Sequence, residues 1–165
     1  MATTTGTHLA EIIRAALAEL KAVCAGVDEA TASRAPAGRW SPKEILSHLI
    51  GAEEGDHLAL CRKFTEADVP LIDIVPEQTH LTPERSAMSF SQLAQLVERE
   101  YEGVAAYALT LSEEQFARTA HIPLFKQSPL TEYPTLAAIV GGMGQYHVRM
   151  HTDHLRQVLA ELAAK

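Results

Sequence analysis

Residues 40–49 read WSPKEILSHL and contain the clearest helix start in the chain. Ser41 can cap the helix, Pro42 suits its first position, and Glu44 completes a Ser-x-x-Glu capping box. Apolar residues then recur at helical spacing on one face: Ile45, Leu49, Ala52, Leu60 and Phe64. The pattern therefore predicts a long helix through Gly51 and Gly55, which weaken it without ending it.

Three further stretches carry an apolar stripe at three- and four-residue spacing: residues 9–23, 90–107 and 135–163. Prolines punctuate the two long connections between helices: Pro70, Pro76, Pro83, Pro123, Pro129 and Pro134. No stretch shows sustained period-two alternation, although residues 121–125 are expected to form a short extended piece. The chain therefore predicts an all-α fold, a four-helix bundle with long crossover connections, of which one spans residues 68–86.

Composition narrows the class of protein further. The chain has 165 residues, of which 47% are hydrophobic, and a formal net charge of −7, which predicts one globular domain over residues 1–165. The acidic balance and the lack of a basic cluster argue against nucleic acid and against an anionic membrane surface as partners. We expect a cytoplasmic protein, because the N-terminus lacks a signal-peptide pattern and two cysteines cannot form a disulfide framework.

Histidines are concentrated near the C-terminus. Three of the eight in the chain lie within residues 147–154, which read HVRMHTDH. On a helix, positions four and seven apart fall on one stripe, and a His-x-x-x-His pair can ligate one metal ion. The same pairs also occur on solvated helix faces without any role. Here the stripe continues through Met143 and Leu155 toward the bundle interior, where buried imidazoles need partners.

A third ligand is expected from another helix. His48 lies among the apolar residues of the helix that begins at Ser41, and bundle metal sites draw on facing helices. A lone histidine in such a place is more often a satisfied core residue, so the argument depends on its pairing with the C-terminal histidines. Helical geometry alone allows either His147 with His151 or His151 with His154 as the ligating pair.

Three segments together resemble the DinB-like superfamily, in its YfiT/bacillithiol-transferase branch. They are WSPKEILSHL at residues 40–49, YHVRMHTDHL at 146–155, and the linker at 111–123. The resemblance covers residues 40–159 and implies a four-helix bundle with long crossovers. It further implies that His48, His147 and His151 hold a divalent metal such as zinc or nickel, and that His154 is not one of the three ligands.

Three neutral imidazoles leave a metal with its full charge and with open positions, which is typical of catalytic sites. A bound water could attack a carbonyl, or a small thiol could bind as thiolate and attack an electrophile. Known relatives implied by the resemblance join bacillithiol or mycothiol to electrophiles. We therefore expect a metal-dependent transfer of a low-molecular-weight thiol to a small electrophile. A metal-dependent hydrolase and a non-catalytic metal-binding bundle are the alternatives.

Several other residues receive expected roles near this metal. Glu53 and Asp56, beyond His48 on the same predicted helix, are candidates for a general base, although acids on a helix flank usually form a solvated face. Trp40, Tyr146 and His154 are expected to line the pocket. The substrate is expected to be a small molecule, and relatives of this kind are often dimers, so we expect a homodimer.

Overall fold

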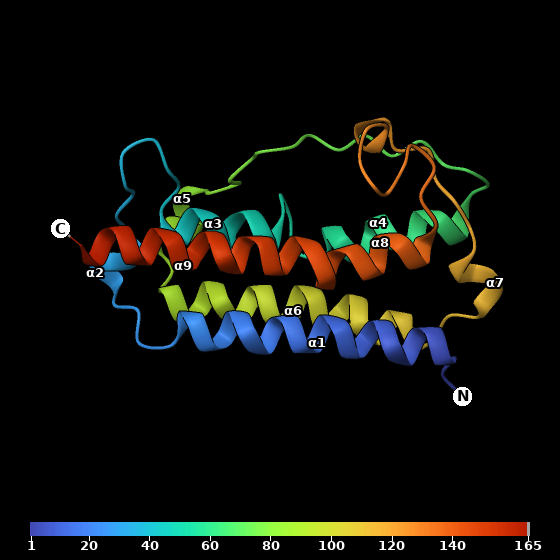
Figure 1. Ribbon diagram of the computed structural model, residues 1–165, viewed down its shortest axis with the longest axis horizontal. Helices are drawn as coiled ribbons and strands as arrows, with labels where there is room; N and C mark the ends of the chain where they lie inside the picture. Colours follow the sequence, from blue (N-terminus) through green and yellow to red (C-terminus); the bar gives the residue numbers. More distant parts are fainter. Residues whose placement is uncertain (165) are drawn as a thin grey trace.

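Four helical stretches lie side by side along the long axis of the molecule (Figure 1). In this computed structural model, which describes residues 1–164, they are α1 (Thr4–Cys24), the pair α3 (Pro42–Ile50) and α4 (Asp56–Glu66), α6 (Phe90–Ala108), and the run α8 (Leu136–Gly142), η2 (Met143–Val148) and α9 (Arg149–Ala163). α1 packs against α6 and the C-terminal run, and the α3–α4 pair packs against the same two from the other side. The all-α bundle with long connections is therefore confirmed.

Short helical turns occupy the connections. They are α2 (Glu29–Ala32), α5 (Pro83–Ala87), α7 (Glu113–Phe116) and a 3-10 turn at Pro123–Phe125. Residues 1–164 contain no regular strand, and their only β-pairing consists of isolated bridges, Leu71 with His121 and Thr119 with Thr135. The expected extended piece at residues 121–125 is thus extended only at its start. No helix within the described residues is long and apolar enough to cross a membrane.

The second predicted helix is interrupted, which corrects the expectation of one continuous helix. Its capping box forms as predicted, because the Ser41 hydroxyl accepts from Glu44 N–H at 3.2 Å and the Glu44 carboxylate accepts from Ser41 N–H at 2.7 Å. α3 nevertheless ends at Ile50, since Gly51 and Gly55 adopt φ of 91° and 90°. Side-chain-bearing residues rarely adopt these conformations, so the glycines end the helix instead of only weakening it.

The C-terminal run stays continuous but changes its hydrogen-bond register. Between α8 and α9, residues Met143–Val148 form a π-helix, in which backbone bonds close wider turns than in an α-helix. Such segments are rare and occur frequently at functional sites. His147 lies inside this segment and His151 lies one turn beyond it, on the side buried against the bundle.

The long connection at residues 68–86 crosses over the bundle and is fixed at several points. Ile72 N–H donates to the His121 carbonyl and His121 N–H to the Pro70 carbonyl, both at 2.9 Å, so the two long connections lie against each other. Further along, the buried Arg85 donates to backbone carbonyls at and beyond the end of α3. The connection therefore reaches the region of His48.

Candidate metal centre

The three histidines expected to bind a metal converge from two helical stretches. His48 comes from the last turn of α3, His147 from the π-helix η2, and His151 from the first turns of α9. One potential ligand atom of each lies within 4.8 Å of the others, and the Nε2 atoms of His48 and His147 are 3.2 Å apart. Of residues 1–164, this is the one group of three or more potential ligands that comes so close together.

In two of the rings, the Nδ1 atom lies within hydrogen-bonding distance of an oxygen atom, and this contact orients the ring. Nδ1 of His48 lies 2.6 Å from the carbonyl oxygen of Gln78, in the crossover connection. Nδ1 of His147 lies 2.9 Å from the hydroxyl of Tyr101, on α6. A carbonyl oxygen only accepts, so Nδ1 of His48 must carry the proton and its Nε2 keeps a lone pair. This is the arrangement that metal-ligating histidines normally show.

The chemistry of the donor set fits a cation. Burial and the neighbouring histidines hold the pKa of His147 well below its ordinary value and lower the pKa of His151 to about 3. Burial lowers the pKa of His48 as well. All three rings are therefore neutral at pH 7, which is the form that binds metals. Among the described residues, Nδ1 of His151 is the one buried side-chain nitrogen or oxygen without a hydrogen-bond partner, a deficit that a bound cation at this centre can relieve.

The residues expected to line the pocket do not all lie at the centre. Trp40 stacks on His151 with ring centroids 6.2 Å apart and an interplanar angle of 6°, and it also contacts His48 at 5.1 Å. His154 lies beside both, 5.8 Å from Trp40 and 5.9 Å from His151. Tyr146, in contrast, is 68% exposed and has no aromatic contact with these rings.

Neither candidate general base belongs to the group of converging histidines. Glu53 is exposed in the loop between α3 and α4. Asp56 caps that loop, because its carboxylate accepts the backbone N–H of Glu53 at 2.9 Å. The structure therefore places both carboxylates outside the group formed by His48, His147 and His151.

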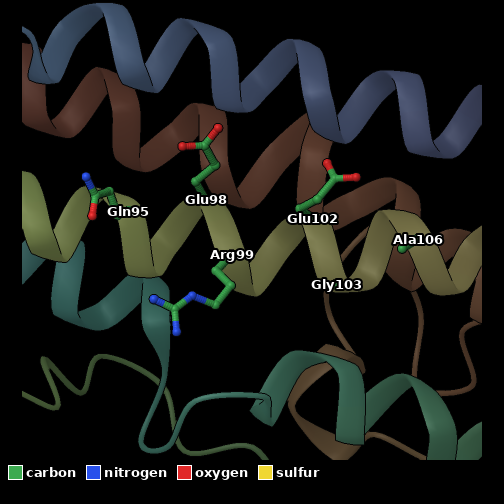
Figure 2. A pocket seen from close by; sticks show the side chains of 6 residues that line it. All are labelled: Gln95, Glu98, Arg99, Glu102, Gly103 and Ala106. Atoms are coloured by element: carbon green, nitrogen blue, oxygen red, sulfur yellow. The ribbon is translucent and has the colours of Figure 1, made fainter.

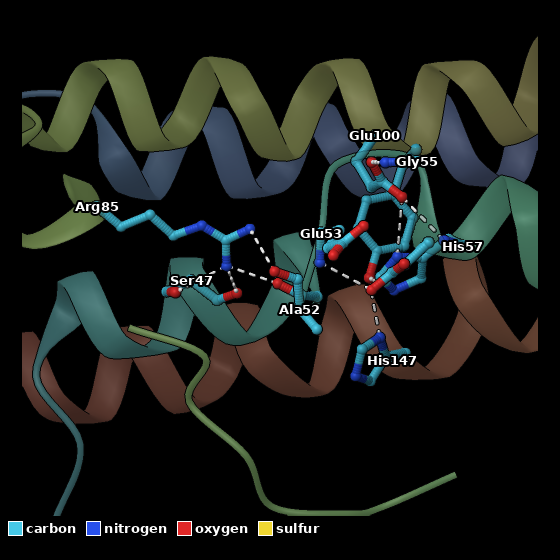
Figure 3. A network of polar contacts seen from close by, with 11 residues as sticks. Ser47, Ala52, Glu53, Gly55, His57, Arg85, Glu100 and His147 are labelled. Carbon is cyan, nitrogen blue, oxygen red and sulfur yellow. Dashed lines mark hydrogen bonds and ion pairs between the residues drawn. The ribbon is translucent and has the colours of Figure 1, made fainter. Parts of the chain in front are cut away.

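A buried polar network behind His147 was not foreseen from the sequence (Figure 3). It contains His57 at the start of α4 together with Glu100 and Tyr101 on α6. The sequence did contain one signal. Glu100 lies three residues beyond Val97 and four before Val104, in the middle of the apolar stripe, where a charged side chain needs partners.

An open pocket lies on α6, lined by Gln95, Glu98, Arg99, Glu102, Gly103 and Ala106 (Figure 2). Its polar side chains are mostly solvated, and Arg99 and Glu98 are 71% and 54% exposed. No histidine lines it. It is therefore an exposed helix face, distinct from the histidine centre.

Comparison with solved structures identifies one similar fold. The whole-chain match is described as "YfiT from Bacillus subtilis is a probable metal-dependent hydrolase with an unusual four-helix bundle topology". The two chains share 19% identity with a TM-score of 0.67, and the match covers 99% of this chain and 89% of the other. At this identity the likeness establishes the fold alone.

Comparisons of sequence give a family. No curated protein matches the chain significantly. The family model of the DinB superfamily, however, matches residues 12–158, which span all four helical stretches and the three converging histidines. The chain therefore belongs to the DinB superfamily.

Proposed function

We propose that the protein is a divalent-metal-dependent enzyme in which His48, His147 and His151 hold zinc or nickel. The observation that carries this proposal is the convergence of three neutral imidazoles, with ligand atoms within 4.8 Å of one another. The unpartnered Nδ1 of His151 supports it, because buried polar atoms without partners are rare in native proteins.

A catalytic role follows from the number of ligands. Structural zinc is usually closed by four protein ligands, whereas catalytic zinc has three and keeps a position open for water or substrate. Within residues 1–164, the group contains three histidines and no cysteine, aspartate or glutamate. When bound, a divalent cation supplies Lewis acidity, which makes a water or a thiol beside it a stronger nucleophile at neutral pH.

We further propose that the nucleophile is a low-molecular-weight thiol. Hydrolysis by an activated water normally also employs a general base, and no carboxylate of residues 1–164 belongs to the group of converging histidines. Glu53 is exposed, Asp56 binds a backbone N–H, and Glu100 is committed to its hydrogen bonds with His57 and Gly55. A thiol has an ordinary pKa of about 8.5 and loses its proton readily beside a positive charge.

The proposed transfer is a substitution at carbon and needs no oxidant or reductant. The thiol gives its proton to solvent, its sulfur forms a bond to an electrophilic carbon, and the leaving group departs with the bonding electron pair. The residues of this chain contribute the three neutral rings and the Trp40 ring, which stacks on His151 and lies beside His48.

Hydrolysis is the second candidate function. Its support is the full-length fold similarity to the structure described as that of a probable metal-dependent hydrolase. Both functions use the same three histidines, and they differ in whether a thiol is required for turnover.

The metal site is tested by elemental analysis of the untagged protein and three variants. We expect about one equivalent of divalent metal in the wild type, its loss in His48→Ala and His151→Ala, and its retention in His154→Ala, because His154 is not one of the three converging rings. Equal loss of metal in His154→Ala would show that His154 is a ligand and that the pair His147 and His151 is wrong. Absence of metal from the wild type after reconstitution with zinc or nickel would refute the proposal.

The reaction is tested with the zinc-loaded protein and a chromogenic aryl halide, with and without bacillithiol or mycothiol. We expect thioether formation that needs both thiol and metal and that His48→Ala abolishes. Turnover of a chromogenic ester in the absence of thiol, without thioether formation, would instead establish the hydrolase.

A further inference from the structure

A line of hydrogen bonds leads from a buried carboxylate to one of the three rings of the metal centre. Oε1 of Glu100 lies 3.1 Å from Nδ1 of His57, whose Nε2 lies 3.2 Å from the hydroxyl of Tyr101. That hydroxyl lies 2.9 Å from Nδ1 of His147. Figure 3 shows Glu100, His57 and His147 along this line. The side chain of Glu100 is only 4% exposed and Tyr101 is fully buried.

The carboxylate fixes the direction of the first hydrogen bond. Burial acts to raise the pKa of Glu100, but hydrogen bonds from the His57 ring and from the backbone N–H groups of Gly55 and His57 outweigh it and hold the pKa below its ordinary range. An ionised carboxylate only accepts hydrogen bonds. His57 therefore donates from Nδ1, and its neutral tautomer with the proton on that atom has a lone pair on Nε2.

The remaining directions follow in turn. In this tautomer Nε2 of His57 accepts, so the hydroxyl proton of Tyr101 is donated to it. A hydroxyl has one proton, so toward His147 the Tyr101 oxygen accepts, and Nδ1 of His147 donates. The Nε2 atom of His147, 3.2 Å from Nε2 of His48, is consequently the one with the free lone pair.

We propose that Glu100, His57 and Tyr101 are positioning residues that hold the proton of His147 on Nδ1 and keep its Nε2 available to a metal ion. This inference rests on the proposed metal centre and names what prepares it. His48 is prepared in one step, by the carbonyl of Gln78, whereas His147 depends on a chain of side chains from two other helices.

A purely structural role would only satisfy the buried hydroxyl of Tyr101 and would not fix the direction of the bonds. The two roles differ in what happens to His147 when a distant member is changed. His57 has no hydrogen bond to His147, so a change at His57 reaches that ring only through Tyr101.

The first test measures zinc affinity by competition with a chromogenic chelator. We expect Tyr101→Phe to bind zinc roughly 10–100-fold more weakly, as is typical when a hydrogen-bond partner of a metal-ligating histidine is lost. The matched control is Tyr107→Phe, because Tyr107 lies on the same helix and its hydroxyl also makes a bond, 3.0 Å from that of Thr65. We expect the control to bind as the wild type does. Wild-type affinity in Tyr101→Phe would overturn the proposal.

The second test reads the proton positions directly, by nitrogen-15 NMR of the histidine rings in the metal-free protein. In the wild type we expect the protons of His57 and His147 on Nδ1. In His57→Phe the Tyr101 hydroxyl has only His147 left as an acceptor, so we expect the proton of His147 to move to Nε2 and zinc affinity to fall. An unchanged His147 signal in folded His57→Phe would overturn the chain.

The two proposals fail in different ways. If wild-type protein binds no zinc, the proposed function falls, while the NMR of the metal-free wild type and of Tyr101→Phe still tests the hydrogen-bond chain. If the wild type binds zinc and both variants match it in affinity and in proton position, the metal centre stands and the positioning role falls. Tyr101→Phe serves this purpose even if His57→Phe does not fold.

Discussion

Two of the four helical stretches change their hydrogen bonding beside the three converging histidines, and each change lies next to a proposed ligand. The α3–α4 stretch breaks open after His48, at Gly51, and resumes at Asp56. The α8–α9 stretch never breaks, and instead accommodates His147 in the π-helix Met143–Val148. The same task, placing a ring at the centre of a bundle, is therefore solved in two ways.

The two interruptions differ in what satisfies the backbone. At the break, the guanidinium of Arg85 donates to the carbonyls of Gly51 at 2.6 Å and of Ser47 at 3.3 Å, although Arg85 lies 34 residues from Gly51 in sequence (Figure 3). In the π segment the corresponding contact is local, since the Thr152 hydroxyl donates to the Val148 carbonyl four residues before it, at 2.7 Å. The carbonyls at the break after α3 thus depend on a residue distant in sequence, whereas the carbonyl at the end of the π-helix is bonded by a residue four positions away.

The largest expected effect on stability comes from removing the long-range hydrogen bonds of Arg85. Arg85→Met keeps an apolar stem but removes the guanidinium hydrogen bonds to the carbonyls of Ser47, Gly51 and His80. We expect the free energy of unfolding to fall by about 3 kcal/mol in urea titrations.

Arg99→Met is the matched control for Arg85→Met. Arg99, whose side chain Figure 2 shows on α6, is 71% exposed. It forms one surface ion pair, with Glu54 at 3.6 Å. Its replacement should change the free energy of unfolding by no more than about 0.5 kcal/mol. A loss in Arg85→Met as small as this would mean that the break in the helix needs no distant donor.

A smaller effect tests how closely the π segment is packed. A Cβ added at Gly144 would lie 2.9 Å from Cγ2 of Ile12 and 3.0 Å from the backbone of Ile13, on α1. Gly144→Ala should therefore lower the free energy of unfolding by about 1–3 kcal/mol through overpacking. Gly103→Ala, on α6 with no atom within 4 Å of the added Cβ, should raise it by about 0.5–1 kcal/mol. Thermal unfolding of both variants checks the opposite signs, and a stabilised Gly144→Ala would show that α1 can move aside.

The sequence predicts the bundle but not these two interruptions. Amphipathic stripes and the Ser41 capping box are local patterns, and they identified all four helical stretches. The break at Gly51 could not be told from a weak helix, because its stabilising partner, Arg85, lies in another element. The π segment has no residue signature of its own, since only its hydrogen-bond register differs from that of an α-helix.

In the candidate site, too, the sequence predicts the residues that stand in local patterns but not their partners from other helices. His48, His147 and His151 stand out in the sequence through their spacing and the helix faces that carry them. Their partners do not, because His57 and Tyr101 come from α4 and α6 and meet His147 only in the folded chain. Proximity along one predicted helix points to Glu53 and Asp56, but that helix ends at Ile50, before it reaches either residue.

The smallest expected effect on stability comes from removing the local hydrogen bond of Thr152 to the π-helix. Thr152 is fully buried, and Thr152→Val removes its hydroxyl with little change in shape, so the carbonyl at the end of the π segment loses one donor. We expect a loss of about 1 kcal/mol in the free energy of unfolding, measured by urea titration. Thr110→Val removes an equally short bond, 2.7 Å to the Tyr107 carbonyl, but at an exposed position, where water replaces it and the change should stay within about 0.5 kcal/mol. Equal losses in the two variants would mean that the π segment places no special demand on Val148, and that its register is held by packing against α1 alone.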